Sequence, residues 1–195
     1  MSRKLVFVVC LAALLFVVFV VPAWAATVAP NTWARKFCST LDSFEQKLNR
    51  DGAAADAALS SQATDLKAAK SQLVSFMNKS VANAKHAVQE LQRAGTPKIP
   101  NGNKIATTFV NALKSAQSLY ASAATTAGSL STSNLAKFET TAQKITASLR
   151  KGGERLSGTF RNEPTIDAGG AFRRVLQATP ACAFLKGTTS TTTTG

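Results

Sequence analysis

The stretch WARKFCSTLDSFEQKL, residues 33–48, decides the fold. Its large apolar side chains recur at spacings of 4, 4, 3 and 4, which is the pattern of one buried helix face. These side chains are Trp33, Phe37, Leu41, Phe44 and Leu48. Cys38 lies on the flank of that face, where a helix can meet a neighbouring segment. The spacing predicts an amphipathic helix with its N-cap at Asn31 or Thr32 and its end at Gly52.

The same helical period continues along the chain, and strand-like alternation is nearly absent. A second and longer helix is predicted from an apolar face that starts at Leu59 and reaches Leu91, with Gly95 and Pro97 marking its end. A third helix starts near Asn103. Its face repeats almost as a heptad: Ile105, Phe109, Leu113, Ala116, Tyr120, Ala123, Ala127 and Leu130.

A fourth helix is predicted after the segment STSN, residues 131–134. Its apolar face keeps the same phase through Leu156 and Phe160 only if the helix continues through Gly152 and Gly153. Each glycine costs about 1 kcal/mol inside a helix, a cost that burial of the two later side chains can offset. We therefore expect one long helix that stops before Pro164.

The last segment is expected to form a short helix capped by Asp167, with Phe172, Val175 and Leu176 on its apolar side. Pro180 then starts a helical turn capped by Thr179, which presents Cys182, with Leu185 on the same face. These patterns together predict an all-α fold: an antiparallel up-down four-helix bundle with a short C-terminal helix, closed by one disulfide.

The two ends of the chain are predicted to lie outside this domain. Residues 1–25 combine a short basic start, an apolar run from Leu5 to Val21 and an Ala-x-Ala site, as a secretory signal peptide does. We expect cleavage after Ala25, with an uncleaved membrane anchor as the alternative. Residues 26–187 form the helical bundle domain, and the Thr-rich residues 188–195 form a disordered tail.

Removal of the signal peptide would also remove Cys10 and leave Cys38 and Cys182, which are 144 positions apart. Two cysteines in an exported chain favour a disulfide, worth up to about 5 kcal/mol for so long a loop. A metal site would need further ligands, and a catalytic thiol would need a base. His86 is the sole histidine, and the helical wheel places it on the solvent side.

The sequence contains no motif that carries catalytic chemistry. It lacks the nucleophile elbow, the zinc-protease helix, the phosphate-binding loop and the dinucleotide fingerprint, and its ten acidic residues are scattered. The sole tyrosine, Tyr120, is interpreted as a core residue with a hydrogen-bonded hydroxyl. We expect no catalytic residue, no cofactor and no metal site, and an enzyme of unrecognised type remains a third hypothesis.

The sequence has a marked excess of basic over acidic residues, 23 against 10. Loss of Arg3 and Lys4 with the signal peptide lowers the net charge from +13 to +11. Such a surface attracts anionic envelope polymers or lipid headgroups. The basic residues occur as doublets without interleaved aromatic residues, which disfavours a nucleic-acid partner. A surface that only solubilises the protein is the simpler interpretation.

Three stretches, KFCSTLDSFEQKL (36–48), AGTPKIPNGNKIATTFVNALKSA (94–116) and AFRRVLQATPACAFL (171–185), resemble a group of small secreted helical proteins of actinobacteria. Those proteins share an early cysteine, a Gly-x-Pro-x-x-Pro-x-Gly turn and a closing Pro-x-Cys. The resemblance implies topology and an extracellular compartment but no activity. This chain departs from the group at Phe44, near which the group has a tryptophan.

The leading functional hypothesis is a secreted, cell-wall-associated or extracellular helical bundle with a basic surface, which acts as a binding or structural module at the cell envelope. The alternative is a membrane-active or lipid-carrying helical bundle, which would need apolar faces that can be released or a cavity between the helices.

Overall fold

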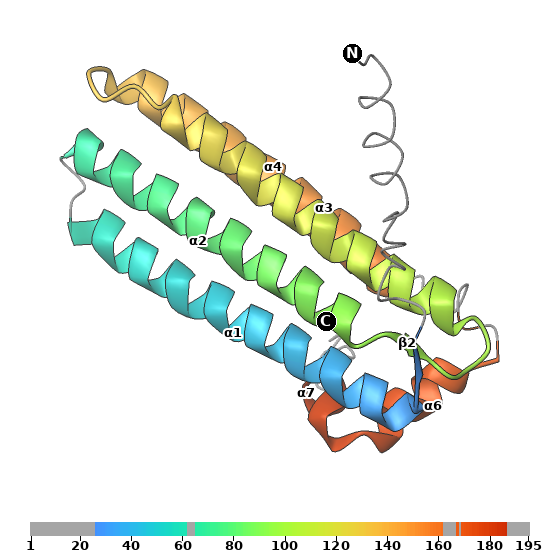
Figure 1. Cartoon of the computed structure of the whole chain (residues 1–195). Helices are drawn as coiled ribbons and strands as arrows, with labels where there is room; N and C mark the ends of the chain where they lie inside the picture. The colour runs from blue at the N-terminus through green and yellow to red at the C-terminus, as the bar shows by residue number, and fades with distance from the viewer. Residues whose placement is uncertain (1–25, 62–64, 162–166, 168, 187–195) are drawn as a thin grey trace, which may run out of the picture.

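The computed structural model describes residues 26–61, 65–161, 167 and 169–186. Within these residues the chain is mainly helical, as predicted, and its long helices lie side by side (Figure 1). They are α1 (Pro30–Ser61), α2 (Leu66–Arg93), α3 (Gly102–Gly128) and α4 (Leu135–Arg161). The predicted signal peptide, the Thr-rich tail and the helix stop at Pro164 lie outside the described residues.

Helix α1 begins earlier than predicted. Its first residue is Pro30, whose fixed φ suits the first turn of a helix. The amide of Trp33 donates to the carbonyl of Ala29 at 3.0 Å, so the first turn closes on Ala29. The prediction of an N-cap at Asn31 or Thr32 was therefore wrong, because both residues lie inside the first turn.

Helix α1 also ends later than predicted. It passes through Gly52 and continues to Ser61, so Leu59 belongs to α1 and the predicted boundary between the first two helices was wrong. Residues 53–58, AAADAA, include five alanines, the strongest helix former, which offset the cost of the glycine. Helix α2 then starts after Asp65, whose carboxylate accepts hydrogen bonds from the amides of Lys67 and Ala68.

A two-residue parallel strand pair, which the sequence pattern did not reveal, joins the start of the described chain to the α2–α3 connection. Strand β1 (Thr27–Val28) pairs with β2 (Thr96–Pro97). The amide of Thr96 donates to the carbonyl of Ala26 at 3.0 Å, and the amide of Lys98 donates to Val28 at 2.9 Å. This pairing anchors the chain immediately before α1.

Both glycines of the Gly-x-Pro-x-x-Pro-x-Gly turn are needed for this connection. Gly95 has φ +75°, and a Cβ there would lie 2.6 Å from the carbonyl oxygen of Ala26. A Cβ at Gly102 would lie 2.0 Å from the carbonyl oxygen of Pro97. As predicted, α2 ends just before Gly95, and α3 begins within one residue of the expected start.

The prediction that α4 continues through the glycine pair is confirmed, since the helix runs without interruption from Leu135 to Arg161. Gly152 faces α3, where a Cβ would lie 2.1 Å from a methyl carbon of Leu119. Gly153 has no neighbouring atom within 4 Å of the corresponding position. The first glycine therefore allows the close approach of α3 and α4, and the second has no such role.

The core consists of two clusters at opposite ends of the long helices. The first is rich in aromatic side chains: Trp33 stacks on Phe37 with ring centroids 4.9 Å apart, and Phe109 and Phe172 complete the group. The second cluster is built mainly from small and medium-sized buried residues: Met77, Ala123, Ala127, Leu130 and Ile145. The predicted apolar faces of the helices supply both clusters.

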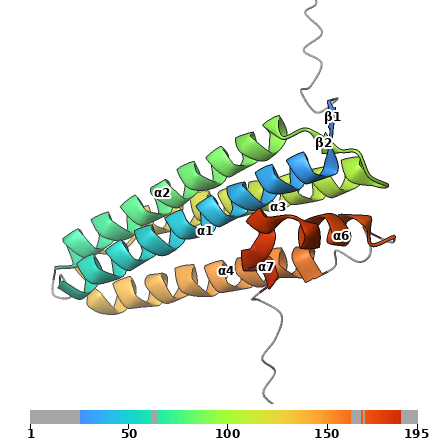
Figure 2. The ribbon, with the colours of Figure 1, turned by 90° about the horizontal axis from the view of Figure 1, so that it is seen from below.

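The C-terminal segment packs against α1 (Figure 2). Its residue Phe172 belongs to the aromatic cluster. It comprises α6 (Ala171–Ala178), the 3-10 turn η3 (Pro180–Cys182) and α7 (Ala183–Lys186). The buried carboxylate of Asp167 accepts hydrogen bonds from the amides of Phe172 and Arg173 at 3.0 and 2.9 Å. Asp167 thus caps α6 as predicted, although the residue at the N-cap position is Gly170.

Candidate functional site

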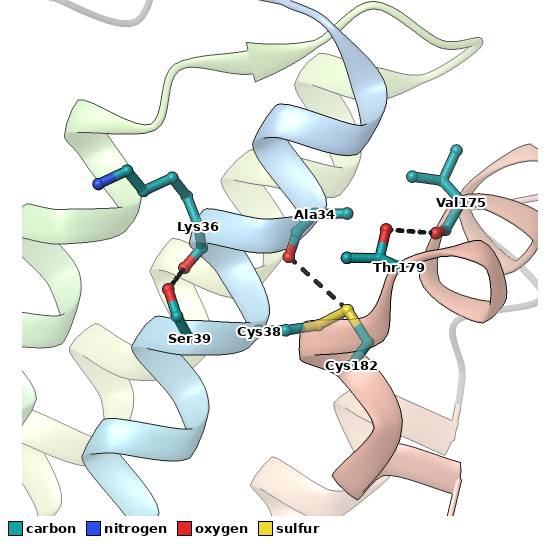
Figure 3. The surroundings of a disulfide bond; sticks show 7 residues. All are labelled: Ala34, Lys36, Cys38, Ser39, Val175, Thr179 and Cys182. Atoms are coloured by element: carbon teal, nitrogen blue, oxygen red, sulfur yellow. Dashed lines mark hydrogen bonds between the residues drawn. A yellow bond between two sulfur atoms is a disulfide. The ribbon is translucent and has the colours of Figure 1, made fainter.

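The disulfide between Cys38 and Cys182 joins α1 to η3, as expected from the sequence (Figure 3). Both cysteines are buried, at 0% and 1% exposure, and their Cα atoms lie 5.1 Å apart. The sulfur of Cys182 lies 3.7 Å from the carbonyl oxygen of Ala34. This is a packing contact, because a disulfide sulfur carries no proton to donate. A bond so enclosed is suited to a structural role rather than to thiol chemistry.

The turn that presents Cys182 is built as predicted, with Pro180 at the first position of η3 and Thr179 at its N-cap. The hydroxyl of Thr179 does not cap this turn; it donates backwards to the carbonyl of Val175 at 2.7 Å (Figure 3). The amide of Cys182 donates to the carbonyl of Thr179 at 3.0 Å. Thr179 therefore holds α6 and η3 in a fixed relation, and Leu185 packs on the aromatic cluster.

A polar groove of about 180 Å³ lies between α1 and α2, and we call it the α1–α2 groove. Ser39, Ser43 and Lys47 contribute from successive turns of α1. The lining from α2 is Asn83, His86, Ala87 and Glu90, at the i, i+3, i+4 and i+7 spacing of one helix face. Thr40 and Phe44 complete the lining. His86 is exposed, as predicted, but no feature of the sequence indicated that it borders a groove.

An acidic residue adjoins this groove through Asn83. The Asn83 amide donates to the carboxylate of Asp51 at 3.1 Å, and the guanidinium of Arg50 donates to the same group at 3.0 Å. The Asp51 side chain is only 10% exposed. Burial acts to raise the pKa of Asp51, but the hydrogen bonds from Arg50 and Asn83 and the charges of Arg50 and Lys79 outweigh it, so the pKa lies below its ordinary value. Asp51 therefore stays ionised and fixes the Asn83 side chain.

Tyr120 lies half-buried against the second core cluster, in agreement with its predicted core position. Burial raises the pKa of its phenol above the ordinary value. The hydrogen bond that we expected for its hydroxyl stays a prediction.

Helix α4 carries a row of cations on one face. Lys137, Lys144 and Lys151 are seven residues apart, and Arg155 falls in the same angular sector. All four are exposed, and none forms an ion pair with another residue in the described part of the chain. We call this row the α4 basic stripe. At 1.5 Å per residue its lysines lie about 10.5 Å apart along the helix axis.

Some of the described acidic residues, unlike the cations of the stripe, form ion pairs. Of the carboxylates in the described ranges, Asp51, Glu90 and Glu154 form ion pairs, with Arg50, Arg93 and Arg150 respectively. The Glu154–Arg150 pair also lies on α4, where it removes one negative charge from the surroundings of the stripe. The sequence contained the signal for the stripe, which is a lysine every seven residues within a predicted helix.

Within residues 26–61, 65–161, 167 and 169–186, no group of three or more His, Cys, Asp or Glu side chains is placed to hold a metal ion. Over the same residues no helix has both the length and the apolar character that crossing a membrane requires. Comparison with protein-family models, with curated proteins and with solved structures finds no match to this chain.

Proposed function

We propose that this protein is an exported, non-catalytic helical bundle that binds anionic polymers of the cell envelope through the α4 basic stripe. The observation that carries the proposal is the stripe itself: four exposed cations on one helix face with no ion-pair partner among the described residues. A row of unpaired cations attracts a chain of phosphates or carboxylates more strongly than the same charges spread over the whole surface do.

The proposal includes an antiparallel up-down arrangement of the four long helices. The Trp33 indole near the start of α1 donates to the carbonyl of Gly95 just after α2, at 2.9 Å. Lys70 near the start of α2 donates to the carbonyl of Leu130 just after α3, at 3.1 Å. Both contacts join a helix start to the end of the next helix, as an antiparallel pair requires. The connection from α3 to α4, residues 129–134, is short.

The proposal also includes export, with cleavage after Ala25. A buried disulfide supports export, because disulfides persist in oxidising compartments. The test is N-terminal sequencing of protein recovered from the envelope and the medium of its host. The expected first residue is Ala26; material that still begins with Met1 would show that the segment is retained.

The α4 basic stripe is tested by retention of the purified protein on envelope material at about 0.1 M and about 1 M salt, where the Debye length falls from about 10 Å to about 3 Å. Retention is expected at low salt and not at high salt. A variant with Lys137, Lys144, Lys151 and Arg155 all changed to Gln should lose it. The matched control changes four exposed lysines elsewhere to Gln: Lys67, Lys85, Lys98 and Lys104. Equal losses in both variants would mean that net charge, and not the stripe, causes retention.

One observation favours a membrane-active alternative. Leu135, the first residue of α4, is 56% exposed and is the only large apolar side chain so exposed in the described part of the chain. Leu135 and Lys137 both lie in the first turn of α4, so an anionic membrane that meets this end of the helix could contact both groups. Leakage of anionic vesicles that is abolished by Leu135→Ser would support this alternative. Retention on envelope polymer that is insensitive to Leu135→Ser would support the polymer proposal.

A further inference from the structure

The α1–α2 groove combines an apolar floor with a polar rim. Two of its lining residues are apolar: Ala87 is only 2% exposed, and Phe44 is half-buried against the aromatic cluster. Around them stand hydroxyl, amide, imidazole, ammonium and carboxylate groups from two helices. A concave surface of this kind suits a ligand with one apolar face and several hydroxyl groups, and a sugar ring has that form.

The groove, with a volume of about 180 Å³, is large enough to receive one small ring. The groove is also open to solvent, so a ring that belongs to a longer polymer could enter it without passing through an enclosed channel.

The charged groups in the groove indicate the sign of the charge that the ligand carries. The carboxylate of Glu90 is already bound by Arg93, and the amide of Asn83 is bound by Asp51. Lys47 is half-buried and has no ion-pair partner in the described part of the chain. A half-buried ammonium group gains from an anion that displaces water around it. We propose that the α1–α2 groove binds a single sugar residue that carries a carboxylate or phosphate group.

This inference is independent of the α4 basic stripe, because the two sites use different helices. Lys47 would pair with the anionic group, and Ser43, Asn83 and His86 would exchange hydrogen bonds with the ring hydroxyls. Glu90, held by Arg93, can still accept a hydrogen bond from a hydroxyl because a carboxylate has about four acceptor sites.

The test is a titration of the full protein with glucuronate, glucose 1-phosphate and neutral glucose, followed by amide chemical shifts in nuclear magnetic resonance spectra. Saturable shifts confined to residues 39–47 and 83–90 are expected for the two anionic sugars, with a Kd on the order of 1 mM. Glucose should bind several-fold more weakly. Absence of saturable shifts in these segments with either anionic sugar would overturn the proposal.

Two variants with one control make the test specific. Lys47→Met keeps the apolar stem of the side chain. It should weaken the binding of glucuronate about fivefold without changing the affinity for glucose. Ser43→Leu, at an exposed position, should fill the groove and abolish the shifts. Lys36→Met, also exposed on α1 but outside the lining, is the control and should bind as the unmodified protein does.

Equal affinity of Lys47→Met and the control for glucuronate would overturn the role of the charge. The glutamine variant of the α4 stripe should bind glucuronate normally, so failure of one proposal leaves the other unaffected.

Discussion

The indole N–H of Trp33 donates a hydrogen bond of 2.9 Å to the carbonyl oxygen of Gly95, a residue 62 positions later. Trp33 is 1% exposed and stacks on Phe37, and Gly95 is the left-handed residue that follows α2. One side chain thus fills the aromatic cluster and satisfies a carbonyl in the connection that carries β2. The bond couples the first helix to the turn on which the strand pair depends.

Trp33→Phe should lower the free energy of unfolding by about 1–3 kcal/mol, because it leaves the buried Gly95 carbonyl without its donor. Chemical denaturation followed by far-ultraviolet circular dichroism measures the change. Thr32→Ala, at the exposed neighbouring position, is the control and should change stability by less than about 0.5 kcal/mol. Equal stabilities of the two variants would show that the hydrogen bond does not contribute.

The double variant Cys38→Ala/Cys182→Ala should lose about 2–5 kcal/mol of stability, since the disulfide closes a loop of 144 residues. Protection of the backbone amides from hydrogen exchange should fall unevenly over the molecule, because η3 is attached to α1 through this bond. Hydrogen exchange should accelerate most in α6 and η3 and least in α3. Uniform acceleration over the molecule would contradict this local role of the disulfide.

Gly153→Ala should stabilise the protein by up to about 1 kcal/mol, because alanine favours the helix and its Cβ meets no atom within 4 Å. Gly152→Ala brings the same gain in helix propensity, but its Cβ would overlap Leu119. We therefore expect Gly152→Ala to be less stable than Gly153→Ala in thermal unfolding. Equal stabilities would mean that α3 and α4 are not in close contact at Gly152.

The phenol of Tyr120 should titrate above about 10 in the folded protein, because burial disfavours the tyrosinate. The folded state then binds the proton more tightly than the unfolded state does. This contribution to stability is complete below the pKa of the unfolded chain and is lost as the pH rises above it. Tyrosinate absorbance in native and denatured protein measures the two titrations, and Tyr120→Phe should remove the alkaline loss. Identical titrations would show that the ring is solvated.

The end of a helix could be predicted from the sequence where the residues there prevent the helix from continuing. Gly95 and Pro97 set the end of α2. Leu149 and Leu156 lie on the same helix face only if the helix continues between them, and this spacing correctly predicted that α4 runs through two glycines. Gly52 misled the prediction because a single glycine costs about 1 kcal/mol, which neighbouring alanines offset. A glycine stops a helix only when the backbone leaves the right-handed region, as at Gly95.

The strand pair and the α1–α2 groove could not be read from the sequence for different reasons. Strands β1 and β2 have two residues each, which is too short for an alternating pattern. The groove depends on which helix faces meet, and Ser39, Ser43 and Lys47 simply appeared as the solvated side of the first helix. A polar face becomes a site only when tertiary packing sets a second polar face beside it.

The pairing of Cys38 with a cysteine 144 positions later has a consequence for biosynthesis. A polypeptide still being synthesised cannot form this bond until Cys182 has been added. Products that terminate before Cys182 therefore keep a free thiol at Cys38, whereas molecules that have formed the bond do not. Alkylation with a thiol reagent after denaturation would separate the two populations, so the bond serves as a chemical mark of synthesis beyond Cys182.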